Sequence, residues 1–132
     1  MLYGPTLEVD IGFDPAFDPS KPGVPVPGVK GLMALVDTGA TESCIDSLLA
    51  ASLQLPIVDR RAVSGSAGSH MANVYLSQVH IPALGRTIYG AFAGVDLATG
   101  GQPHSALIGR TFLRHLTMTY EGRTGAVTIS DD

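Results

Sequence analysis

Asp37 is the residue whose surroundings best fit a chemical role in this 132-residue chain. It follows the apolar run of residues 29–36 and opens the segment Asp37-Thr38-Gly39-Ala40. A carboxylate directly after a buried run is costly unless it is hydrogen-bonded or shares a proton. Two interpretations follow: a turn Asp that accepts backbone N–H groups, or an acid–base catalyst. As an acid–base catalyst, such a group can act with a second carboxylate, one taking a proton from water and the other polarising a carbonyl.

The chain carries this motif once. The segment of residues 96–100 also contains Asp, Thr and Gly, but their spacing is wrong for a second copy. Two carboxylates about 3 Å apart share one proton because both cannot ionise together. A two-acid mechanism therefore requires a homodimer, in which Asp37 meets the same residue of a second copy across a two-fold axis.

The elements that must position Asp37 are short. The chain has 16 Gly and 9 Pro, which favour short strands joined by turns over long helices. Short apolar or alternating runs predict strands near residues 3–13, 29–36, 57–63, 71–81, 86–95, 105–108, 116–120 and 126–130. Asp46 is expected to cap a short helix through residue 55, and residues 111–115 suit one helical turn.

These runs predict a mostly-β single domain over residues 1–132, closed as a β-barrel, with one or two short helices. Residues 14–28 form a proline-rich exposed connection, because so many prolines exclude a helix or a central strand. Residues 64–70 form a hairpin tip of small residues, and residues 116–130 form a C-terminal hairpin around a glycine-containing turn.

Charge and cysteine content exclude several functions. The net charge is −4 without a Lys/Arg run, which argues against binding to nucleic acid or an anionic membrane. No apolar run approaches the ~20 residues that span a bilayer. The N-terminus lacks the features of a signal peptide. The single cysteine, Cys44, is expected to be a core residue in a reducing compartment. We therefore predict a cytoplasmic protein, alone or as part of a longer chain.

The sequence gives no sign of a metal or another cofactor. The four histidines show no paired ligand spacing, so no metal site is predicted.

Three segments in this order resemble the retropepsin-like family of aspartic proteases, the retroviral-type half-enzymes. The first is the strand that ends in Asp37-Thr38-Gly39-Ala40, and the second is the hairpin tip 64–70, which resembles the family's flap. The third is the apolar-apolar-Gly-Arg segment of residues 107–110, followed by Phe112 and Leu113. The resemblance covers residues 32–130, and the C-terminal hairpin is similar to cellular and bacterial members of the family.

The resemblance implies a homodimeric aspartic endopeptidase that acts on peptides or proteins. Asp37 would be the catalytic acid and base. Thr38 would form a hydrogen bond across the dimer axis, and the Gly39 carbonyl would accept one from the substrate backbone. The side-chain pockets would be lined by Ala40, Leu107 and the flap residues Gly65, Ser66, Ala67 and Gly68.

Two further roles are implied next to this loop. Gly109 would let the chain pass close beneath the Asp37 loop, and Arg110 would be a structural ion-pair residue. In viral members an Asp often follows the Ala of the motif and pairs with this Arg, but here the position is Thr41. Glu42 or Asp46 is expected to take its place. The alternative function is a non-catalytic dimerisation or peptide-binding module on the same fold.

Overall fold

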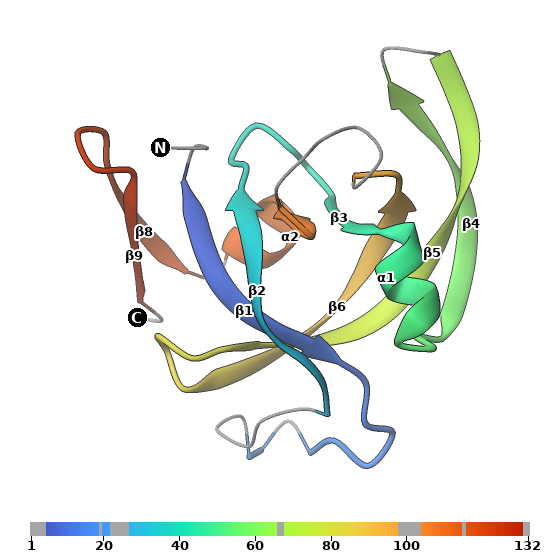
Figure 1. Cartoon of the computed structure of the whole chain (residues 1–132), viewed down its shortest axis with the longest axis horizontal. Coiled ribbons are helices and arrows are strands. Elements are labelled where there is room, and N and C mark those ends of the chain that lie inside the picture. Colours follow the sequence, from blue (N-terminus) through green and yellow to red (C-terminus); the bar gives the residue numbers. More distant parts are fainter. Residues whose placement is uncertain are drawn as a thin grey trace.

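β-Strands of 3 to 14 residues and two short helices dominate the part of the chain that the structure describes (Figure 1). The computed structural model describes residues 5–18, 20–21, 27–65, 68–97, 104–114 and 116–130. The elements are β1 Thr6–Gly12, β2 Gly28–Val36, β3 Ser43–Asp46, α1 Ser47–Ser52, β4 Ile57–Gly65, β5 Gly68–Ile81, β6 Arg86–Val95, β7 Ala106–Ile108, α2 Arg110–Leu113, β8 Thr117–Glu121 and β9 Ala126–Ser130. Neither helix is long and apolar enough to cross a membrane.

Six strands close into a barrel in the order β1-β2-β7-β3-β6-β5, because β5 pairs back onto β1. Most neighbours are antiparallel, whereas β2–β7 and β3–β6 are parallel. Strand β4 lies outside the ring and pairs with β5, and β8 and β9 form a separate two-stranded sheet. The predicted closed, mostly-β fold is therefore confirmed.

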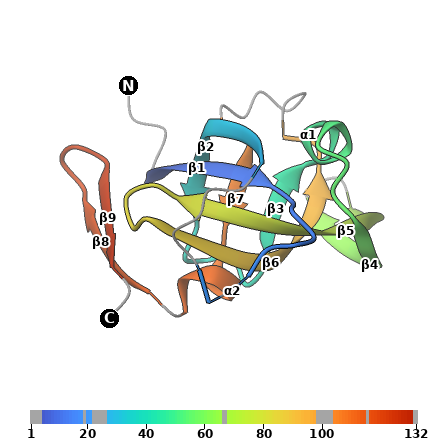
Figure 2. The same cartoon turned by 90° about the horizontal axis from the view of Figure 1, so that it is seen from below.

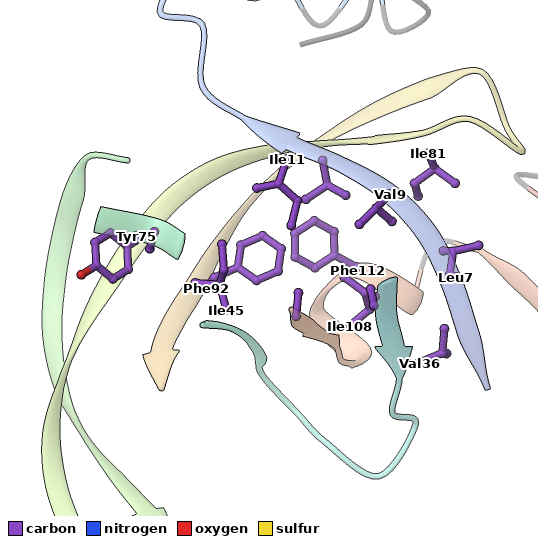
Figure 3. Close-up of a cluster of buried hydrophobic side chains, with 14 of the residues drawn as sticks. Leu7, Val9, Ile11, Val36, Ile45, Tyr75, Ile81, Phe92, Ile108 and Phe112 are labelled. Carbon is purple, nitrogen blue, oxygen red and sulfur yellow. The ribbon is translucent and has the colours of Figure 1, made fainter. Parts of the chain in front are cut away.

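The core fills the inside of this barrel with alternating residues of its strands. Val9 and Ile11 of β1 and Phe92 of β6 are fully buried (Figure 3). Helix α2 adds Phe112, whose ring centroid lies 4.9 Å from that of Phe92. A Cβ on Gly90 would lie 2.2 Å from the Phe112 ring, so this glycine makes room for the aromatic pair. The core thus fastens α2 to the barrel next to the end of β7.

Several predicted boundaries shift. Strand β6 has the predicted range, whereas β1 is shorter than the predicted range 3–13. Strands β4 and β5 are longer, since their ladder continues through Ser64↔Ser69 to Gly65↔Gly68. The hairpin tip is therefore shorter than the predicted 64–70, and Ser66 and Ala67 lie outside the described residues. Strand β3 was not predicted at all.

Helix α1 begins where the sequence places its cap. The Asp46 carboxylate accepts a hydrogen bond from the Leu49 N–H at 3.2 Å, which satisfies one of the free donors of the first turn. The helix ends at Ser52, earlier than predicted, because Gln54 adopts a positive φ of 53° and turns the chain. Helix α2 is the predicted single turn, displaced by one residue at its start.

Candidate active site

Asp37 lies directly after β2, in the loop that leads to β3. Its N–H donates to the Ile108 carbonyl of β7 at 2.9 Å, and its Oδ1 accepts from the Gly39 N–H at 3.0 Å. Among the described residues the other carboxylate oxygen has no hydrogen-bond partner. Asp37 is half-buried, whereas Thr38 and Gly39 are exposed. The carboxylate is thus fixed through one oxygen in a loop that faces outward.

The segment after β7 holds this loop through backbone hydrogen bonds. The Arg110 N–H donates to the Ala40 carbonyl at 2.9 Å, and the Thr111 N–H donates to the Thr41 carbonyl at 3.2 Å. The Asp37–Ile108 bond extends the β2–β7 pairing, and these two bonds join the start of α2 to the part of the loop that precedes β3. The loop backbone is therefore held along most of its length.

Gly109 sits at the point of closest approach between the two segments. A Cβ at this position would lie 2.5 Å from the Glu42 carbonyl oxygen and 2.8 Å from the Ala40 carbonyl oxygen. The Gly109 N–H donates to the Ser43 hydroxyl at 2.9 Å, and that hydroxyl is 3.1 Å from the Thr111 hydroxyl. Glycine is required here because both obstacles are backbone atoms.

Arg110 contacts the loop through neutral groups. Its guanidinium donates to the Thr38 carbonyl at 2.9 Å and to the Thr41 hydroxyl at 2.8 Å. The predicted ion pair with Glu42 or Asp46 is wrong. Glu42 pairs with an arginine of β4, and Asp46 accepts from the backbone of α1 and of residue 97. The hydroxyl at residue 41 accepts the hydrogen bond for which a carboxylate was expected, so the contact survives without an ion pair.

A row of three side chains crosses the sheet beside this loop. Leu35, Leu107 and Cys44 are direct partners on β2, β7 and β3, so they lie on one face. Each is half-buried, and each alternates with core residues on its strand. Burial raises the pKa of the Cys44 thiol, and the nearby charges of Glu42 and Asp37 raise it further. We call this set the Leu35–Leu107–Cys44 row.

Sequence reasoning identified only Leu107 of this row and treated Cys44 as a core residue. Strand β3 was not predicted, and without it the orientation of Cys44 could not be inferred. Within β3, Cys44 is half-buried and its neighbour Ile45 is buried, so the two side chains lie on opposite faces. Among the described residues no group of three or more His, Cys, Asp or Glu side chains could hold a metal ion.

The β4–β5 hairpin extends away from the barrel beside the loop. In the view of Figure 1, the loop between β2 and β3 lies at the upper side, between the β8–β9 hairpin on the left and the β4–β5 hairpin on the right. The backbones of Gly65 and Gly68 form the last described pair of the ladder. One ion pair, between Arg61 of β4 and Glu42, links the hairpin to the loop.

Comparison with known proteins supports the same fold. No family model and no curated protein matches the chain. The solution structure of the protease of simian foamy virus (mac) matches with a TM-score of 0.52 and 16% identity, and covers 83% of this chain and 91% of that chain. A Legionella pneumophila protein of unknown function covers 83% of this chain and 84% of its own, with a TM-score of 0.45 and 12% identity.

The first likeness defines the class of fold: the chain has a retropepsin-like fold, shared with a retroviral protease. The second likeness carries no argument.

Proposed function

We propose that the chain is an aspartic endopeptidase that is active as a homodimer. One observation carries the proposal: the Asp37 carboxylate is fixed by the Gly39 N–H in an outward-facing loop that the barrel supports. The Asp37-Thr38-Gly39 motif supplies one acid per chain, whereas metal-free hydrolysis of a peptide bond needs two. The loop's remaining acid, Glu42, is paired with Arg61. A second copy of the chain supplies the other acid through a two-fold axis.

In this dimer the two Asp37 carboxylates share one proton. The ionised carboxylate takes a proton from water, and the water oxygen attacks the carbonyl carbon of the peptide. The protonated carboxyl donates a hydrogen bond to the carbonyl oxygen, where negative charge develops. When the tetrahedral intermediate collapses, the carboxyl that took the proton from water gives it to the peptide nitrogen, the C–N bond breaks, and the pair again holds one proton.

The neighbouring groups suit this chemistry. The exposed Thr38 hydroxyl has no partner among the described residues and is available to the second copy. The Gly39 carbonyl is available to a substrate N–H, and Ala40 and the Leu35–Leu107–Cys44 row offer apolar contact. The β4–β5 hairpin, including Gly65, Ser66, Ala67 and Gly68, would close over an extended peptide as a flap.

The C-terminal hairpin is the second part of the proposed interface. Strands β8 and β9 form a sheet of their own, which stands apart from the barrel ribbon in Figure 2. Most of its residues are exposed, among them Tyr120. A two-stranded sheet is marginally stable alone, and no third strand of the described residues joins it. A second copy would extend this sheet across the two-fold axis.

The test is digestion of a peptide library at several pH values, with the wild type and Asp37→Asn side by side. We expect cleavage by the wild type, inhibition by a statine-type transition-state mimic, and no cleavage by Asp37→Asn. Sedimentation of both proteins should show a dimer. Cleavage by Asp37→Asn at the wild-type rate would overturn the proposal. A dimer that binds peptides without cleaving them would instead support the non-catalytic module.

A further inference from the structure

We propose that Glu42 and Arg61 are positioning residues whose ion pair holds the β4–β5 hairpin at a set place relative to the Asp37 loop. We call this contact the hairpin latch. Its effect on substrate binding rests on the proposed protease function, whereas its effect on the hairpin does not. The latch would hold each hairpin near the position that the structure shows and would break when a substrate enters.

The first observation is how little else holds the hairpin. Strand β4 is the last strand of its sheet and pairs with β5 alone. Among the described side chains of β4, Arg61 makes the one polar contact that reaches beyond the hairpin. In the β4–β5 ladder, Arg61 lies opposite Ala72, which is buried. The neighbouring Arg60 is exposed. Arg61 therefore lies on the face of β4 that turns toward the protein.

The second observation is that the other end of the latch is fixed. Glu42 follows Thr41, which receives hydrogen bonds from both Arg110 and Thr111. The Glu42 carbonyl oxygen lies in the close approach to Gly109. The ion pair therefore connects the last strand of the sheet with a loop that hydrogen bonds hold in place.

The third observation is that the latch is not packed tightly. A cavity of about 100 Å³ adjoins it, lined by Glu42, Ser43, Arg61, Ala91, Ala93 and Thr111. The Arg61 Nε is buried and has no hydrogen-bond partner among the described residues, which is unfavourable for a polar group. Both latch side chains are about 40% exposed, at 40% and 41%. The ion pair therefore holds the hairpin against the loop with little support from packing. We expect such a contact to break and re-form readily.

Hydrogen exchange of the β4–β5 ladder tests the latch directly. All variants carry Asp37→Asn so that self-cleavage cannot occur. Exposed ion pairs are weak, so we expect Glu42→Gln and Arg61→Gln to speed exchange of the ladder amides about two- to five-fold. High salt should speed exchange in the parent toward the same rate and should change the variants little.

The matched control is Arg60→Gln, which removes the same charge from the adjacent residue of β4. It should leave the exchange rates at the parent value. The double exchange of Glu42→Arg with Arg61→Glu should restore slow exchange, because it recreates the pair with reversed charges. Parent-like exchange in both single variants, or equal acceleration by Arg60→Gln, would overturn the latch.

Peptide cleavage tests the positioning role. In chains that retain Asp37, we expect Glu42→Gln and Arg61→Gln to raise KM about two- to five-fold while kcat changes less, because the chemistry at Asp37 is untouched. An unchanged KM alongside faster exchange would overturn the role in substrate binding. If the wild type cleaves no peptide, the proposed function fails, and the exchange rates still decide the latch.

Discussion

Replacing Gly109 by alanine should distort the Asp37 loop. The new Cβ would lie 2.5 Å from the Glu42 carbonyl oxygen and 2.8 Å from the Ala40 carbonyl oxygen. The Glu42 oxygen must therefore retreat by roughly half an ångström even to reach a contact that proteins tolerate. The φ of Gly109 is −97°, which alanine adopts freely, so the cost is steric and not conformational.

Overpacking typically costs about 1–3 kcal/mol. Two rigid backbone contacts place Gly109→Ala near the upper end of that range. The same free energy lowers the melting temperature by roughly 10 °C for a chain of this size. A displacement of about 1 Å at a catalytic group can cost about 100-fold in rate, so we expect cleavage to fall by about 10-fold or more.

The assay is calorimetry and peptide cleavage on Gly109→Ala and Gly122→Ala at equal protein concentration, because the melting temperature of a dimer depends on concentration. Gly122 is the matched control, since a Cβ there meets no atom within 4 Å and its φ is not positive. We expect Gly122→Ala to melt within a few degrees of the wild type. Equal stability of the two variants would refute the close approach at Gly109.

Three smaller predictions follow from local environments. Burial lowers the pKa of His104, so the folded chain binds a proton there less readily than the unfolded chain. The resulting contribution to stability is complete above about pH 6.5, the usual pKa of histidine. As the pH falls below that value, the unfolded chain is protonated first, which favours unfolding. Urea unfolding at a series of pH values should therefore show a greater loss of stability for the wild type than for His104→Gln. Parallel plots of stability against pH would contradict this. Burial and the charges of Glu42 and Asp37 raise the pKa of the Cys44 thiol, so iodoacetamide at neutral pH should react faster with the unfolded than with the folded chain. A hydroxyl that donates to the ionised Asp37 favours its charged form, so Ala40→Ser should move the acid limb of the pH–rate profile to lower pH; an unmoved limb would show that residue 40 does not tune the pair.

The parts of the fold that sequence patterns predicted are those that local interactions determine. Strand β6 alternates and ends at turn residues, so its range 86–95 was predicted in full. The cap of α1 is also a local interaction, because Asp46 accepts a hydrogen bond from the N–H of Leu49, three residues later. The position of Asp37 after a buried strand follows from the apolar run before it.

The parts that were missed depend on pairing between distant residues. Strand β3 has only four residues, and it is a strand because β6 and β7, about 50 to 60 residues later, lie on either side of it. The Arg61–Glu42 pair joins the β4–β5 hairpin to the loop, yet the charged run of residues 59–61 has the pattern of a solvated surface. The Arg110 contact was expected from resemblance, but its partner at residue 41 is a hydroxyl.

The separate β8–β9 sheet and the single Asp37 point to the same requirement from different physics. A two-stranded sheet outside the barrel gains little from its own pairing, and Ile129 is its one residue that is buried. The proposed metal-free hydrolysis of a peptide bond needs a second carboxylate beside Asp37. Both deficits belong to surfaces of one chain, and one two-fold axis can remove both together. If that axis exists, the order of the C-terminal hairpin and the completion of the site form one equilibrium, governed by protein concentration.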